Sequence, residues 1–149
     1  MSEEKDALDE VERIWANQAK ELSQLSDEEA EAAVNRVLRR RAVAYCETIG
    51  AFVAPILVAV TSPTSYSFAF SVAGVGLFLY IFGSLLTVYM LEKKLPGATK
   101  IPDWEHRVPV GLEGGLFVPR WTSHSSLIGY SLFPSGLIVA FLLWVGIVD

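Results

Sequence analysis

The sequence predicts an all-α membrane protein, in which an N-terminal cytoplasmic amphipathic helical hairpin (residues 1–41) precedes a three-span membrane domain (residues 42–149). Two observations favour this class. Apolar residues make up 52% of the 149 positions and charged residues only 19%, which is unusual for a soluble domain. Of the 17 Asp and Glu, 11 lie in the first 31 residues, and much of the apolar material is concentrated in three later runs. Lipid is therefore the expected solvent of those runs.

Residues 2–25 carry apolar side chains at intervals of three and four, which is typical of an amphipathic helix with one polar interruption at Gln18. The stripe consists of Leu8, Val11, Trp15, Leu22 and Leu25. One interpretation is that this face packs on the next helix or on the membrane surface of the same subunit. The other is a short coiled coil with a second chain.

Ser26 and Glu29 have the S-x-x-E spacing of a capping box, which indicates a second helix that begins beside Ser26. No Gly or Pro follows until Gly50, so we expect this helix to run without interruption into the membrane. Small side chains such as Ala30 and Ala33 would let it approach the first helix closely and complete a hairpin over residues 3–41.

The three predicted spans cover residues 42–60, 66–91 and 127–148. The first is about 28 Å of helix, close to the thickness of the hydrocarbon layer. Pro55 interrupts its hydrogen bonding, and Thr48 or a neighbouring helix is expected to compensate for part of the loss. The second contains Gly74, Gly76 and Gly83, which allow close helix contact. Four prolines exclude a continuous helix from the Pro/Gly-rich cytoplasmic loop at 92–126.

The basic residues predict the orientation of the chain. With three spans, all 12 Lys and Arg fall on one side, which is the pattern of cytoplasmic segments. We therefore expect an integral protein of the plasma (cell inner) membrane, with the N-terminus cytoplasmic and the C-terminus outside. The acidic N-terminal region and low lysine content fit a salt-adapted prokaryote. The residues that determine the topology are Arg36, Arg39, Arg40, Arg41, Lys93 and Lys94.

Glu47 is the one charged residue inside a predicted span, roughly 9 Å along the helix from Arg41. A carboxylate at that depth needs a proton, a partner or water. Three interpretations are open: pairing with a nearby Arg at headgroup level, contact with a partner subunit, or a place on a proton or ion pathway.

The cytoplasmic loop holds a second set of candidates, namely Asp103, Glu105, His106 and His124. Two His and two acids could ligate a metal, and either His could act as a general base. Their spacing matches no standard ligand pattern, so we expect structural or interfacial roles, with no metal, no cofactor and no assigned catalytic residue. The arginines are explained by topology, so we expect no nucleic-acid partner.

The sequence favours a non-enzymatic subunit or accessory/assembly factor of a membrane complex, embedded in the lipid bilayer. Its protein partner would bind through the N-terminal helices or the Gly-rich spans, and a homo-oligomer is possible. The first alternative is a homo-oligomeric small transporter or channel that uses Glu47. The second is a membrane enzyme with its site in the loop at residues 95–126.

Overall fold

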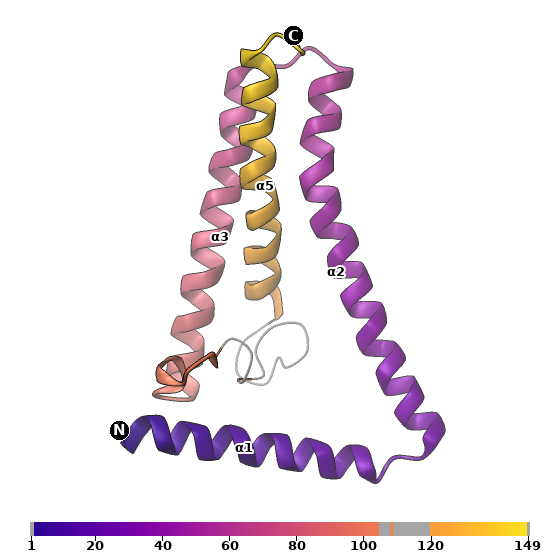
Figure 1. Cartoon of the computed structure of the whole chain (residues 1–149), viewed down its shortest axis with the longest axis vertical. Helices are drawn as coiled ribbons and strands as arrows, with labels where there is room; N and C mark the ends of the chain where they lie inside the picture. The colour runs from indigo at the N-terminus through magenta and orange to yellow at the C-terminus, as the bar shows by residue number, and fades with distance from the viewer. Residues whose placement is uncertain (1, 105–107, 109–119, 149) are drawn as a thin grey trace. The chain divides into compact units, whose positions relative to one another are not determined.

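The computed structural model describes residues 2–104, 108 and 120–148 (Figure 1). Within these ranges the regular structure is entirely helical. It consists of α1 (Ser2–Ser23), α2 (Asp27–Thr61), α3 (Tyr66–Lys94), the short 3₁₀ helix η1 (Ala98–Lys100) and α5 (Arg120–Trp144). Three of the described helices, α2, α3 and α5, are long and apolar enough to cross a membrane. The predictions of a helical fold and of three helices able to cross a membrane are confirmed for the described residues.

The start of α2 is the predicted capping box. The Ser26 hydroxyl accepts a hydrogen bond from the backbone N–H of Glu29 at 3.4 Å, and the Glu29 carboxylate accepts one from the backbone N–H of Ser26 at 3.1 Å. This reciprocal pair satisfies two N–H groups that have no partner inside a helix. From there α2 continues through 35 residues as one helix, as expected from the absence of breakers before Gly50.

Helix α5 does not have the bounds predicted for the third span, 127–148, because it begins earlier and ends earlier. Helix α5 begins at Arg120, directly after Pro119, because no further Gly or Pro occurs before Gly129. It ends at Trp144, where Gly146 has a φ of 70°. Ile147 N–H then donates to the Leu142 carbonyl and Gly146 N–H to the Leu143 carbonyl, a Schellman motif. Residues 120–126 therefore belong to a helix and not to the predicted loop at 92–126.

The chain divides into two compact units, one of Met1–Ala42 with Leu86–Arg120 and the other of Val43–Leu85 with Trp121–Asp149. Each is described by itself below. The division into domains 1–41 and 42–149 that the composition suggests stays a prediction.

In the first unit, α1 packs against the end of α3 and the turn that follows it. The α1 residues Ala7 and Val11 are buried there, with Leu8 partly buried beside them. Their buried neighbours are Leu91, Leu95, Ala98, Ile101 and Val108. Among the described side chains, this cluster includes none from α2. The predicted hairpin over residues 3–41 is thus not confirmed, and the apolar face of α1 has a different neighbour.

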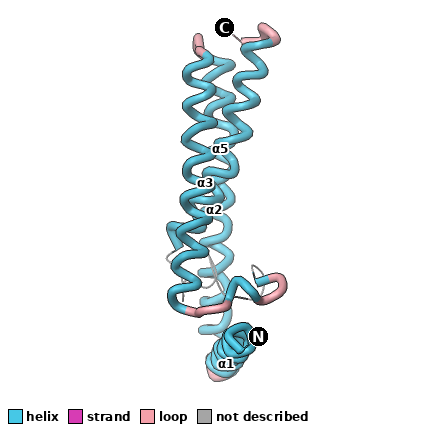
Figure 2. The backbone as a smooth tube through the Cα atoms, turned by 90° about the vertical axis from the view of Figure 1, so that its left-hand side faces the viewer, coloured by secondary structure: helices cyan, strands magenta, loops and turns pink. Residues whose placement is uncertain are grey.

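In the second unit, α3 and α5 run alongside each other and approach closely (Figures 1 and 2). A Cβ atom added at Gly129 of α5 would lie 2.3 Å from the Tyr80 nitrogen and 2.6 Å from the Gly76 oxygen. Gly83 and Gly136 face equally close backbone atoms across the same contact. The glycines therefore serve the packing of these two helices, as small residues do in membranes.

Candidate functional site

The structure brings Glu47 of α2 and His124 of α5 into contact, through Glu47 Oε2 and His124 Nε2. The two side chains are 50% and 28% exposed, so the pair lies at the edge of the helix contact. A neutral imidazole that carries its proton on Nε2 donates a hydrogen bond to the carboxylate, and a protonated one adds a charge pair. Pairing with a nearby Arg was one of three interpretations of Glu47, and the partner that the described structure shows is a histidine.

The sequence positions of Glu47 and His124 show which end of their helices carries the pair. Glu47 lies six residues after Arg41, and His124 lies four residues after Arg120. Both helices run onward from these basic residues into apolar sequence, so the two polar side chains belong to the same end of their spans. The start of α5 after Pro119 was the signal that could have placed His124 in a helix. The Ser- and Thr-rich residues 122–126 were assigned to the loop from the sequence, so the helical position of His124 was missed.

Other polar side chains of the second unit are also paired between helices or within them. The hydroxyls of Ser84 in α3 and Ser126 in α5 are hydrogen-bonded at 2.9 Å. Fully buried Ser135 of α5 donates to the Phe52 carbonyl of α2 at 2.7 Å. Thr48 donates to the Ala44 carbonyl of its own helix at 2.7 Å. In the described part of the chain, no fully buried side-chain nitrogen or oxygen lacks a hydrogen-bond partner.

Charged side chains and histidines do not continue across the spans. Residues 48–61 of α2, 66–91 of α3 and 125–144 of α5 contain no Asp, Glu, Lys, Arg or His. A side-chain proton relay needs such groups in sequence through the membrane. Within one chain, Glu47 and His124 therefore lie at one end of their helices, and no Asp, Glu, Lys, Arg or His follows them in residues 48–61 or 125–144.

The four loop candidates do not form a constellation in the described structure. Asp103 is exposed in the first unit, with a φ of 56°, at a turn in which Trp104 N–H donates to the Ile101 carbonyl at 3.2 Å. His124 is a helix residue of the second unit, which corrects its assignment to the loop. Glu105 and His106 lie outside the described residues. No group of three or more His, Cys, Asp or Glu side chains suited to a metal ion occurs in the parts of the chain that are described.

The six basic residues that were predicted to determine the topology are exposed on α2 and α3. Arg36, Arg39, Arg40 and Arg41 are exposed on α2, and Lys93 and Lys94 are exposed in the last turn of α3. The Arg36 Nε also donates to the Ala32 carbonyl at 3.3 Å.

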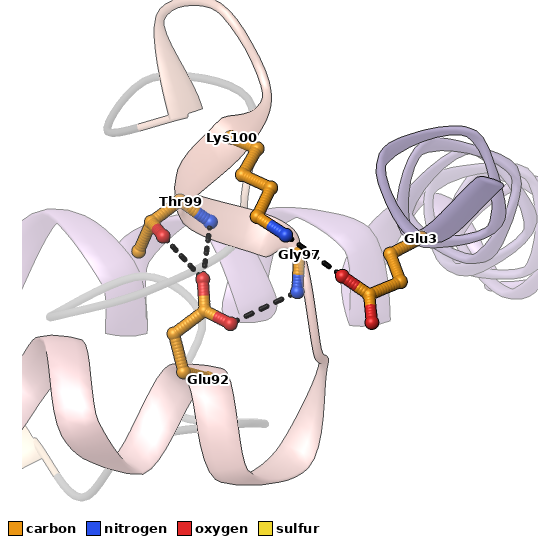
Figure 3. A network of polar contacts seen from close by, with 5 residues as sticks. All are labelled: Glu3, Glu92, Gly97, Thr99 and Lys100. Atoms are coloured by element: carbon orange, nitrogen blue, oxygen red, sulfur yellow. Dashed lines mark hydrogen bonds and ion pairs between the residues drawn. The ribbon is translucent and has the colours of Figure 1, made fainter. Parts of the chain in front are cut away.

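A polar network that the sequence did not reveal closes the end of α3 in the first unit (Figure 3). The Glu92 carboxylate accepts hydrogen bonds from the backbone N–H groups of Gly97 and Thr99, each at 2.9 Å, and from the Thr99 hydroxyl. Gly97 has a φ of 87°, and an added Cβ would lie 2.9 Å from the Glu3 carbonyl oxygen. This turn therefore requires glycine both for its backbone conformation and for the close approach of α1.

Next to this turn, Lys100 Nζ donates to Glu3 Oε2 at 2.7 Å and joins η1 to the first turn of α1 (Figure 3). This hydrogen bond and the attraction between the charges lower the pKa of the Glu3 carboxyl and raise the pKa of the Lys100 ammonium. The pair fixes α1 to the turn on the polar side, as Ala7 and Val11 do on the apolar side.

No family model, curated protein or solved structure matches this chain. Any function proposed for it therefore rests on its own residues and their geometry.

Proposed function

We propose that the protein is a non-enzymatic subunit or accessory factor of a membrane complex. The observation that carries the proposal is the internal pairing of the polar side chains between its spans. Glu47 contacts His124, Ser84 contacts Ser126, and Ser135 contacts the Phe52 carbonyl. Polar groups that hold one another in this way fix helix positions and leave few groups to bind a substrate.

The surface for a protein partner is better sought on the N-terminal helices than on the Gly-rich spans. Gly76, Gly83, Gly129 and Gly136 are already used in the contact between α3 and α5. On the part of α2 that precedes Arg39, Val34 and Leu38 are more than half exposed at 55% and 54%. They lie four residues apart and therefore on one side of the helix, as an apolar contact surface requires.

Copurification tests this proposal. The full chain is isolated from its native membranes in a mild detergent, with a Val34→Ser/Leu38→Ser variant and an Ile147→Ser control at an exposed apolar position outside the N-terminal helices. We expect a second protein to copurify with the wild type and the control and to be lost from the double variant. Isolation of the wild type as a monomer without a second protein would contradict the proposal.

The orientation belongs to the same proposal: the N-terminus is cytoplasmic and the C-terminus outside, in the plasma membrane. Its support is the distribution of basic residues, including exposed Arg39 and Lys93. Single cysteines at Ser26 or Thr64, in a Cys46→Ser background, test it with a membrane-impermeant maleimide on intact cells. We expect Thr64→Cys to react and Ser26→Cys to react only after lysis.

The contact between Glu47 and His124 favours a second candidate, a homo-oligomeric transporter or channel that moves protons or ions. His and carboxylate pairs within spans are common in such pathways. Because the charged groups of one chain reach only one end of the spans, the rest of the path would run between subunits. In reconstituted vesicles, Glu47→Gln should abolish flux and Ser125→Ala should not. Equal flux in all three proteins would rule this candidate out.

A further inference from the structure

We propose that Arg36, Arg39 and Arg40 of α2 bind the headgroups of anionic phospholipids. The three guanidinium groups are exposed, and Arg39 and Arg40 lie three and four residues after Arg36. At these intervals side chains are neighbours on a helix surface. The helix thus gathers three positive charges in one place.

The helix itself supplies no counter-charge to this arginine cluster. Acidic residues three or four positions away would neutralise it. The positions at those distances from the three arginines are instead Ala32, Ala33, Asn35, Val37, Ala42, Val43, Ala44 and the arginines themselves. Like charges at these intervals destabilise a helix, so an anion that binds to the arginine cluster would stabilise this part of α2.

Four acidic side chains of the first unit are engaged elsewhere in the described structure. Glu3 pairs with Lys100, Glu10 with Arg13, and Glu29 with the cap at Ser26. Glu92 accepts its hydrogen bonds from Gly97 and Thr99. No described acidic side chain forms an ion pair with Arg36, Arg39 or Arg40, and the anion we infer comes from outside the chain.

The position of the cluster identifies that anion as a lipid phosphate. The apolar run Ala42–Val60 begins two residues after Arg40, which places the guanidinium groups at headgroup level. Ala42, the first residue of this run, is exposed and offers apolar surface to the acyl chains. Guanidinium groups bind phosphate oxygens through two parallel hydrogen bonds. A free phosphate would satisfy the charges but not the apolar surface.

The test measures how much phosphatidylglycerol and phosphatidylcholine the purified full chain retains from mixed micelles, by native mass spectrometry. The variant is Arg39→Gln/Arg40→Gln. The control, Lys5→Gln/Lys20→Gln, removes the same charge from exposed positions on α1. We expect the wild type and the control to prefer phosphatidylglycerol, and the preference to fall roughly tenfold or more in the arginine variant.

Two further measurements complete the test. Glycerol 3-phosphate at the concentration of the lipid should not displace it, and full displacement would overturn the assignment to lipid. Added salt should release phosphatidylglycerol from the wild type and leave retained phosphatidylcholine unchanged. This measurement uses the wild type alone and does not depend on whether a variant folds. Equal retention of both lipids by the wild type would overturn the proposal, as would an equal loss in the lysine control.

Discussion

The hydroxyl of Ser135 in α5 donates a 2.7 Å hydrogen bond to the backbone carbonyl of Phe52 in α2. Three residues later, Pro55 has no N–H to donate to the carbonyl of residue 51, and its ring loosens this part of the helix. Ser135 thus supports the α2 backbone beside its proline, which is how neighbouring helices accommodate proline in membranes. The sequence had offered two sources of such support, Thr48 or a neighbouring helix, and the Thr48 hydroxyl donates to the Ala44 carbonyl instead.

We expect Ser135→Ala to destabilise the second unit by about 1 kcal/mol, the usual magnitude for a hydrogen bond between membrane helices. The measurement is unfolding in mixed micelles that contain increasing amounts of a denaturing detergent. Ser125→Ala is the matched control, because Ser125 donates to the Trp121 carbonyl of its own helix. If the two substitutions lower the free energy of unfolding equally, the hydrogen bond to Phe52 does not contribute more to stability than a bond within one helix.

Gly129→Ala should separate α3 from α5. The new methyl group would lie 2.3 Å from the Tyr80 nitrogen, and a backbone atom cannot move aside as a flexible side chain can. We expect a loss of about 2 kcal/mol, within the range for overpacked cores, in the same unfolding measurement. Gly74→Ala is the control, because nothing lies within 4 Å of its added Cβ. That variant should be neutral or more stable by up to about 1 kcal/mol, from helix propensity alone.

The ion pair between Glu3 and Lys100 predicts how the docking of α1 depends on pH. The pKa of Glu3 is lowered by Lys100, so its contribution is present above the pKa of an unfolded Glu and is lost as pH falls through the lower folded value. The pKa of Lys100 is raised by Glu3, so its contribution is lost only as pH rises through that higher value.

Hydrogen exchange of the α1 amides should therefore be slowest, relative to an unstructured reference, between about pH 5 and pH 10. Glu3→Gln should remove the acid limb of this dependence, and Glu4→Gln should leave it in place. A pH dependence that survives in Glu3→Gln would mean that other groups control the docking.

Glu47 and His124 should behave as one unit in a double-mutant cycle. We expect Glu47→Gln and His124→Gln each to weaken the second unit, and the double variant to cost less than the sum because one contact has been removed twice. A coupling on the order of 1 kcal/mol is expected for side chains in direct contact. Additive effects in the detergent unfolding measurement would contradict the contact.

The features that the sequence predicted are local ones. The capping box depends on Ser26 and Glu29, three residues apart, and the continuous helix beyond it depends on the absence of breakers. The existence of three spans follows from long apolar runs alone. Such properties need no knowledge of how one helix meets another.

The features that escaped prediction depend on contacts between distant segments. The meeting of Glu47 with His124 requires the register of α2 against α5, which composition does not specify. Likewise, the burial of Val11 against Leu91 requires the position of the α3 end, and the amphipathic pattern of α1 fits several neighbours equally well. His124 was further concealed because hydroxyl side chains such as Ser126 lower the apparent hydropathy of a helix even when they face another span.

Helix α5 provides one member of each of the three side-chain hydrogen bonds or ion pairs described between helices of the second unit. The ribosome makes α5 after α2 and α3, so these contacts cannot form before the last helix is complete. Until α5 has been made, Glu47 and Ser84 lack the contacts with His124 and Ser126. Completion of the second unit is therefore a late event of biosynthesis, since it depends on the last helix of the chain.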